Sequence, residues 1–550
     1  MILKIKTYMF FPIFSLCLWS IQLTAQSEVV ARGLQSSTEQ TAEMIILTHD
    51  LFYSNMEIFA EHKNRRGIRT KIIRLSEIGV FPEAEEIKAY IHQFIDFNDS
   101  VPTYLLLVGN IYLLPAFRGI NNALNDHEYS TPDSSDYFPR IMVGRFPVNS
   151  VEESELYVRK TIAYENEARN SDSLQWCKAA SIAASNAHLD DMHGRHLVSV
   201  VRNKNFDPVD DFRVANQSFT GNNITSAVNE GRSWLFYLGL GDATSWYVTG
   251  GFNTNSISNS INNSGKLPAI ISVGCRTAAL DHPAGDCLGE RWMNLGIDKG
   301  AILFIGATEN TAFFLSDTLG KHTFLSYLND GSETVGEALV YGKMKMYESF
   351  KVSFSDTAIR EAMQHFLLLG DPSLMPWTEV PEETEVSLNI EADKNLLLVS
   401  VKANGLPVKR ALISLSDDSF GIHQTAYSDA LGQYRFLVDT DDSTRLYLSV
   451  IGKNLKSFRR EFRLNDLLSL TENKVLIYPN PVGQYLTIQS SEDANAVVYN
   501  SRGQIVGSIK LIKGINTIDS KSLSTGVYSI RIAFEHEVVS KRFIKIDRYR

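Results

Sequence analysis

The chain has 550 residues, of which 44% are apolar and 21% are charged, and its formal net charge is −10 at pH 7. This composition is typical of globular protein rather than a disordered chain, and the length predicts several domains instead of one hydrophobic core. The mildly acidic balance excludes a basic footprint for nucleic acid, and it excludes a polybasic surface for anionic lipid.

Residues 1–25 have the pattern of a secretory signal peptide. Lys4 and Lys6 give a positive start, residues 9–18 are mostly apolar, and Ala25 supplies a small residue before the expected cut. The apolar stretch is too short to span a bilayer. We therefore expect an exported chain from which this segment is removed.

Strands and helices alternate from residue 44 to about residue 376. Strands are predicted at residues 44–47, 70–73, 104–108, 179–184, 234–238, 267–273 and 301–306. Helices are predicted at residues 57–65, 83–97 and 193–204. This order is typical of an α/β fold, with a parallel sheet and helices on both faces. Ligands of such sheets bind beyond the carboxyl ends of the strands, where Leu240 and Cys275 fall.

The pattern changes after residue 377, where a polar linker leads into short alternating strands. Strands are predicted at residues 396–401, 411–415, 434–438 and 446–450. They indicate a small β-sandwich over residues 386–467. A second β-rich stretch, residues 474–550, indicates another small sandwich.

The cysteine count points to a free thiol. Cys17 leaves with the signal peptide, so Cys177, Cys275 and Cys287 remain, and an odd number leaves at least one unpaired. Exported proteins usually oxidise or avoid free thiols. The remaining thiol is therefore either chemically useful or a buried, inert cysteine.

Several motifs between residues 44 and 376 occur together in an order that resembles one enzyme family. They include Leu105-Leu106-Leu107-Val108-Gly109, Asp136-Tyr137-Phe138-Pro139, Val143-Gly144-Arg145-Phe146 and Gly370-Asp371-Pro372-Ser373-Leu374. Taken together, this region resembles the gingipain family of cysteine peptidases. The resemblance implies a caspase-like α/β sandwich in two subdomains, residues 26–170 and residues 171–380.

Two further segments carry the resemblance into the active site. Ile271-Ser272-Val273-Gly274-Cys275 resembles the strand that delivers the family's nucleophilic cysteine. Tyr237-Leu238-Gly239-Leu240-Gly241 is similar to the family's Tyr-Thr-Gly-His-Gly, so Leu240 stands at the position of the catalytic histidine. Asn186 falls at the position of the carboxylate that orients this histidine.

These replacements bear directly on the chemistry. A free thiol has a pKa of about 8.5, and an imidazole both promotes the thiolate and protonates the leaving amine. Leucine has no proton to take or give. We therefore expect a pseudopeptidase that keeps Cys275 and binds peptide or protein without cutting it. The alternative is an active cysteine endopeptidase that uses another histidine as base.

The candidate substitutes are few. His188, His193, His196 and His282 follow the strands that carry Asn186 and Cys275, and we expect them to be ordinary surface or helix histidines. Asp242 is a poor base that we expect to cap a turn.

Metal sites have weaker signals. His193 and His196, with Asp190 and Asp191 near, have a spacing that suits zinc, but they lack a recognised motif and are expected to form a solvated face. No catalytic metal and no cofactor is expected. Structural calcium is the one exception, in an acidic loop that contains Asp126, Asp133 and Asp136.

The two trailing domains resemble modules that accompany such peptidases. Residues 386–467 resemble the immunoglobulin-like module that follows the gingipain peptidase unit. Tyr478-Pro479-Asn480-Pro481, Gly526-Val527-Tyr528 and Lys541-Arg542-Phe543 resemble the carboxy-terminal sorting domain of the type IX secretion system of Bacteroidetes. This implies the secretion machinery as a partner. It also implies passage through the periplasm to a secreted state, or to the outer cell surface by anchoring only.

Overall fold

The computed structural model describes residues 43–95, 104–132, 136–166, 174–215, 219–248, 250–391, 396–441, 443–467, 475–534 and 538–546. The predicted signal peptide and Asp133 lie outside these residues. Among the described residues, no helix has the length and hydropathy needed to cross a membrane. The chain divides into two compact units, the first of which contains the large sheet.

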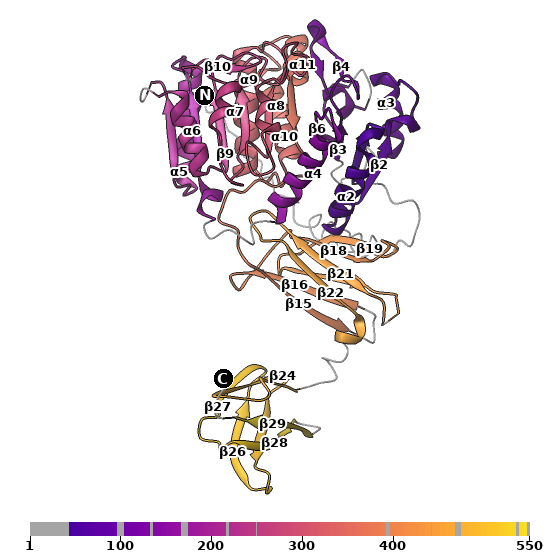
Figure 1. The fold of residues 1–550 in the computed structure, drawn as a ribbon, viewed down its shortest axis with the longest axis vertical. Coiled ribbons are helices and arrows are strands. Elements are labelled where there is room, and N and C mark those ends of the chain that lie inside the picture. The colour runs from indigo at the N-terminus through magenta and orange to yellow at the C-terminus, as the bar shows by residue number, and fades with distance from the viewer. Residues whose placement is uncertain are drawn as a thin grey trace, which may run out of the picture. The chain divides into compact units, whose positions relative to one another are not determined.

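The large sheet has ten strands in the order β2-β1-β3-β6-β14-β13-β12-β9-β7-β8 (Figure 1). Their bounds are β1 (Met44–Thr48), β2 (Thr70–Arg74), β3 (Tyr104–Val108), β6 (Met142–Phe146), β7 (Ala180–Ala184), β8 (Val209–Arg213), β9 (Trp234–Leu238), β12 (Ala269–Val273), β13 (Leu303–Ala307) and β14 (Phe366–Leu369). Strands β13 and β14 pair antiparallel, and the other neighbouring pairs are parallel.

Helices cover both faces of this sheet (Figure 1). Helices α2 (Tyr53–Arg65), α4 (Val151–Asn166), α6 (Gly221–Glu230), α7 (Thr254–Ser260) and α8 (Leu288–Asn294) pack on one face. Helices α3 (Ala84–Ile91), α5 (His188–Asn203), α9 (Phe313–Leu328), α10 (Val335–Phe350) and α11 (Asp356–His365) pack on the other. Short 3-10 helices are η1 (Asp50–Phe52), η2 (Leu75–Glu77), η3 (His92–Phe94), η4 (Ile120–Asn122), η5 (His127–Ser130) and η7 (Gln175–Lys178).

The apolar runs explain why the strands form where they do. In β1, Met44 and Ile46 enter the core on one face, whereas Ile45 and Leu47 enter the core on the other. A strand buried on both faces has no polar side, so it appears in the sequence as a continuous apolar run. The predicted α/β architecture with a mostly parallel sheet is confirmed.

Three helix predictions need correction. The predicted helix at 57–65 begins at Tyr53, four residues earlier than expected. The predicted helix at 83–97 ends at Ile91, and a 3-10 turn continues to Phe94. The predicted helix at 193–204 begins at His188, five residues earlier than expected. Of the five residues before His193, only Leu189 and Met192 are apolar, so the apolar periodicity gave little sign of this first turn.

The first β-sandwich follows the large sheet. One of its sheets joins β15 (Thr384–Glu391), β16 (Leu396–Ala403), β17 (Leu406–Pro407) and β20 (Gln433–Leu437). The other has the order β19 (His423–Tyr427), β18 (Leu412–Asp417), β21 (Leu446–Ile451) and β22 (Phe458–Phe462).

The C-terminal sandwich also has two antiparallel sheets. One joins β23 (Val475–Tyr478), β24 (Tyr485–Ser490) and β27 (Gly514–Asp519). The other has the order β26 (Ile505–Leu511), β25 (Ala494–Tyr499), β28 (Gly526–Ala533) and β29 (Val538–Lys545). Alternate residues of β28 are buried, which is the pattern of a strand with one face on a core.

Two further two-stranded sheets are β4 (Phe117–Arg118) with β5 (Leu124–Asn125), and β10 (Ser245–Trp246) with β11 (Phe252–Asn253).

Candidate functional site

Three neighbouring strand ends bring the predicted site residues together. Ala184 of β7 lies in register with Leu238 of β9, and Leu238 lies in register with Val273 of β12. The ladder continues one residue further. The Ser185 amide donates to the Leu238 carbonyl oxygen at 2.9 Å, and the Gly239 amide donates to the Val273 carbonyl oxygen at 3.1 Å. Two residues beyond these positions, at the same edge of the sheet, the chain carries Asn186, Leu240 and Cys275, respectively.

Cys275 lies in a turn at the end of β12, and hydrogen bonds from Arg276 to Glu309 hold this turn in place. The next residue, Arg276, has a left-handed backbone with φ of 60°. Its amide donates to the carbonyl oxygen of Glu309 at 3.2 Å, and its guanidinium donates to the Glu309 carboxylate at 2.6 Å. Cys275 is a free, half-buried thiol, and its sulfur has no hydrogen bond with any described residue. The turn therefore fixes the position of the thiol without engaging it.

The Leu240 backbone is held firmly while its side chain faces solvent. The Leu240 carbonyl oxygen accepts hydrogen bonds from the Tyr237 hydroxyl at 2.6 Å and from the Tyr247 amide at 3.0 Å. The Leu240 side chain is 61% exposed. The position that resembles the family's histidine therefore keeps its place at the strand end, but it offers only hydrocarbon.

Asp242 forms a turn, as the sequence suggested. One oxygen accepts from the Thr244 amide at 2.8 Å, and the other accepts from the Tyr247 hydroxyl at 2.8 Å. Desolvation raises the pKa of the Asp242 carboxyl, but the hydrogen bonds from Thr244 and Tyr247 outweigh it, so the pKa is lowered overall. A carboxylate with a lowered pKa is a weak base.

The expected solvated face on α5 is confirmed for His196, which is exposed, but it is wrong for Asp190 and His193, which belong to a buried cluster. Asp190 is 1% exposed, His193 is 6% exposed, and Asp317 of α9 is 1% exposed. Desolvation raises the pKa of both Asp190 and Asp317 to about 7, and it lowers the pKa of His193 to about 4. The hydroxyl of Ser185 donates to Asp190. Nothing in the sequence near Asp190 pointed to Asp317, because the two meet only when α5 and α9 pack together.

The four candidate histidines differ in their surroundings. His193 Nδ1 lies 3.6 Å from Asp317 Oδ2, and His188 and His196 are exposed on α5. His282 is half-buried after the Cys275 turn. In the described part of the chain, no hydrogen bond joins an imidazole nitrogen to the Cys275 sulfur.

The described residues also contain no group of three or more His, Cys, Asp or Glu side chains arranged to hold a metal ion. In the acidic loop predicted to hold calcium, both oxygens of Asp126 accept from Arg145, at 2.6 and 2.7 Å. Asp136 accepts from the Arg140 guanidinium at 2.9 Å. Since Asp133 lies outside the described residues, structural calcium in this loop stays a prediction.

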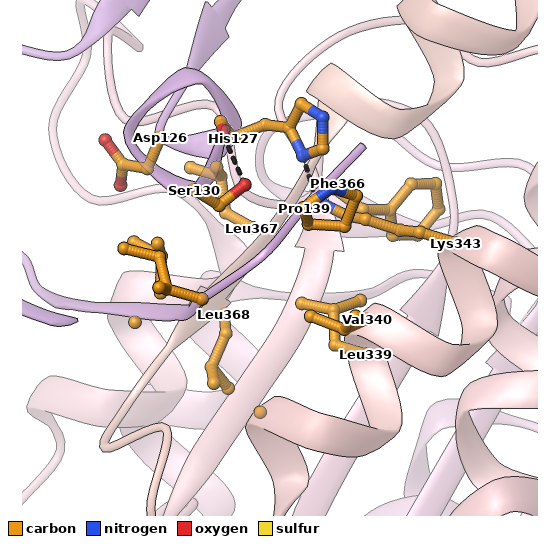
Figure 2. A pocket seen from close by; sticks show the side chains of 14 residues that line it. Asp126, His127, Ser130, Pro139, Leu339, Val340, Lys343, Phe366, Leu367 and Leu368 are labelled. Atoms are coloured by element: carbon orange, nitrogen blue, oxygen red, sulfur yellow. Dashed lines mark hydrogen bonds between the residues drawn. The ribbon is translucent and has the colours of Figure 1, made fainter. Parts of the chain in front are cut away.

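A small cavity lies elsewhere, among β6, β14 and α10 (Figure 2). There the side chain of Lys343 points toward the His127 ring, and Lys343 Nζ lies 3.1 Å from His127 Nδ1. Desolvation lowers the pKa of Lys343 to about 7 and that of His127 well below its ordinary value. With a volume of about 20 Å³ the cavity has room for a water molecule but none for a peptide side chain. It does not include Cys275, Leu240 or Asn186.

Comparison with known protein families identifies the family of the large domain. The model of peptidase family C25 matches residues 37–377, which is more than half of the chain. The chain belongs to peptidase family C25. A second model, the secretion system C-terminal sorting domain, matches residues 476–546. The sorting domain indicates that this C25 homologue is secreted to the cell surface or the extracellular space, which confirms the predicted localisation.

Its relatives include gingipain R2 of Porphyromonas gingivalis strain W83, which is 24% identical over 526 residues, covering 92% of this chain and 68% of the relative. Gingipain R1 of P. gingivalis is 24% identical over 453 residues, covering 78% of this chain and 43% of the relative. The crystal structure of gingipain R, an Arg-specific cysteine proteinase, superposes with a TM-score of 0.68 at 23% identity, covering 78% of this chain and 99% of that one. This similarity establishes the gingipain fold for the C25 homologue.

Proposed function

We propose that this C25 homologue is an exported pseudopeptidase that binds peptide or protein segments at the Cys275 edge without hydrolysing them. The observation that carries the proposal is the alignment of Leu240 with Cys275 two residues beyond adjacent, in-register strands. At the end of β9, which neighbours the strand that carries Cys275, Leu240 is an exposed hydrocarbon.

The missing imidazole removes two steps of thiol catalysis. A base promotes the thiolate before attack, and its conjugate acid then protonates the leaving amine. Each kind of proton transfer contributes about 10²- to 10⁴-fold to the rate. Leu240 supplies neither, so the acyl transfer step loses its acid and its base at once.

The other titratable groups near the thiol are occupied. Asp242 accepts bonds from Thr244 and Tyr247, and the Tyr237 hydroxyl donates to the Leu240 carbonyl. Desolvation raises the pKa of Tyr237 above its ordinary value, so this phenol stays protonated. These bonds support a role for the groups in holding the turn and leave no evident proton carrier for the sulfur.

The test is hydrolysis by the purified full chain of fluorogenic peptide amides that end in Arg, Lys, Leu or Phe. We expect no turnover above that of a Cys275→Ala variant. Leu240→His should restore measurable hydrolysis, with a rate that titrates near the ordinary histidine pKa of about 6.5. Leu240→Ala is the matched control, because it removes the same side chain without adding a base.

Turnover by the native chain that disappears in Cys275→Ala would contradict the proposal and establish an active endopeptidase. In that case, His193→Gln and His282→Gln variants would identify the histidine that serves as base.

A further inference from the structure

We propose that the surface beside Cys275 takes a peptide by an apolar side chain, and that Leu240 and Tyr247 select this side chain against a basic one. The inference rests on the proposed function and names the ligand class of the same site. It differs from the specificity for arginine that the name of the related gingipain R states.

Leu240 and Tyr247 form one exposed apolar surface. Their side chains are 61% and 54% exposed, and the Tyr247 amide donates to the Leu240 carbonyl at 3.0 Å. The Tyr247 hydroxyl donates to Asp242 Oδ2 at 2.8 Å, which holds the ring against the turn that carries Leu240. Exposed large apolar side chains that adjoin one another are typical of binding surfaces.

The surface is rigid before any ligand arrives. The Tyr237 ring stacks on the buried Trp246 ring, with centroids 4.6 Å apart, and the Tyr237 hydroxyl fixes the Leu240 carbonyl at 2.6 Å. Trp246 Nε1 donates to Ser272 Oγ at 2.9 Å, which anchors the β10 turn to the strand that carries Cys275. Because this backbone is already ordered, little conformational entropy is lost when a peptide binds.

The Asp242 carboxylate beside this surface is already hydrogen-bonded within the chain. A lysine or arginine side chain is recognised by a carboxylate that offers free lone pairs. Asp242 has one oxygen bonded to the Thr244 amide and the Thr244 hydroxyl, at 2.8 and 3.1 Å, and the other bonded to the Tyr247 hydroxyl at 2.8 Å. The chain's own donors therefore already take three of the roughly four lone-pair sites of this carboxylate, and a basic ligand would have to compete with them.

Two more carboxylates follow the same strand ends, and both are paired with arginine. Glu309 accepts from Arg276 at 2.6 Å, and Asp281 accepts from Arg118 at 3.0 Å. A basic ligand would have to displace one of these partners, whereas an apolar side chain needs no partner. Covering Leu240 and Tyr247 with a leucine-sized group favours that group by about ten-fold over one that stays in water.

The experiment compares two peptidyl chloromethyl ketones that are identical except for a last residue of Leu or Arg. The Cys275 sulfur forms a bond to the methylene carbon and chloride leaves, so mass spectrometry counts the labelled chains. Cys177 and Cys287 are buried, and Cys275→Ala verifies that labelling reports this thiol. Dividing each rate by the iodoacetamide rate separates peptide recognition from thiol reactivity.

We expect the Leu probe to label the native full chain about ten-fold faster than the Arg probe after this normalisation. Leu240→Ser should remove most of the difference. Tyr247→Phe keeps the ring but frees one Asp242 oxygen, so it should speed the Arg probe about ten-fold and change the Leu probe little. Val80→Ser is the matched control, because Val80 is 87% exposed but follows β2, at the far edge of the sheet.

Equal rates for the two probes, a faster Arg probe, or a Leu240→Ser variant with native preference would each overturn the inference. Fluorogenic amides of the same two peptides distinguish this failure from failure of the proposed function. Cleavage of the Leu amide by the native chain would refute the pseudopeptidase and leave the apolar preference standing. A preference for the Arg probe with no cleavage of either amide would refute the apolar preference and leave the pseudopeptidase standing.

Discussion

Replacing Asp317 should change how the stability of the C25 homologue depends on pH. Asp190 and Asp317 are buried side by side behind the site, with pKa values raised by desolvation to about 7 from an ordinary 3.8. The folded protein therefore holds a proton that the unfolded chain releases above pH 4. A carboxyl with a raised pKa stabilises the fold fully at low pH, and this contribution is lost as pH rises toward 7.

The magnitude follows from the size of the shift. One pKa unit corresponds to about 1.4 kcal/mol, so one sheltered carboxyl costs the folded state about 3 kcal/mol between pH 5 and pH 7. We count one carboxyl because the substitution removes one. Asp317→Asn should therefore gain about 1 to 3 kcal/mol over the native chain when the pH is raised from 5 to 7.5.

Other groups around the pair titrate in the same range, so the comparison must be between variants. Desolvation lowers the pKa of His193 and of His322 to about 4, which makes the fold gain stability as pH rises toward 6.5. Lys321 faces Asp317 and favours its charged form, and the Ser185 hydroxyl bonds Asp190. The contribution of His322 is common to both chains and cancels in the difference, whereas those of His193 and Lys321 include their interaction with Asp317 and change with the substitution.

The assay is thermal unfolding of the full chain at pH 5 and pH 7.5, followed at the transition of the large domain. The difference in midpoint between Asp317→Asn and the native chain should grow by about 1 to 4 °C from pH 5 to pH 7.5. Glu57→Gln, an exposed carboxylate on α2, should show no such change. A difference between Asp317→Asn and the native chain that is the same at both pH values would refute the reasoning.

Three further substitutions probe buried contacts. Arg145→Leu strands the Asp126 carboxylate in the interior and should lower the unfolding free energy in urea by about 3 to 5 kcal/mol, most of which Asp126→Asn in the same chain should recover. Lys160→Met leaves three backbone carbonyl oxygens, now 2.7 to 3.4 Å from the ammonium, without their donor, and should cost about 2 kcal/mol in the same urea assay. Gly144→Ala places a methyl group 2.3 Å from the Gly370 carbonyl oxygen, where β6 meets β14. Calorimetry should show that the free energy of unfolding falls by about 1 to 3 kcal/mol. An unchanged unfolding midpoint would mean that the two strands move apart without cost.

The sequence by itself located the sheet and the thiol. Strands such as Trp234–Leu238 are buried on both faces, so their sequences are continuous apolar runs that need no tertiary information to recognise. The two Gly-bounded ends that carry Leu240 and Cys275 followed from the same runs. The leucine at position 240, where the resemblance implies a histidine, was likewise visible as a change of residue type.

Tertiary structure decided what surrounds that position. Register between β7, β9 and β12 aligned Asn186, Leu240 and Cys275 at one edge. Packing of α9 on α5 buried Asp190 against Asp317, which turned an apparent solvated face into a proton-holding pair. Strand formation is a local consequence of apolar side chains, whereas exposure and pKa depend on neighbours that arrive from distant parts of the chain, so only the folded structure could determine them.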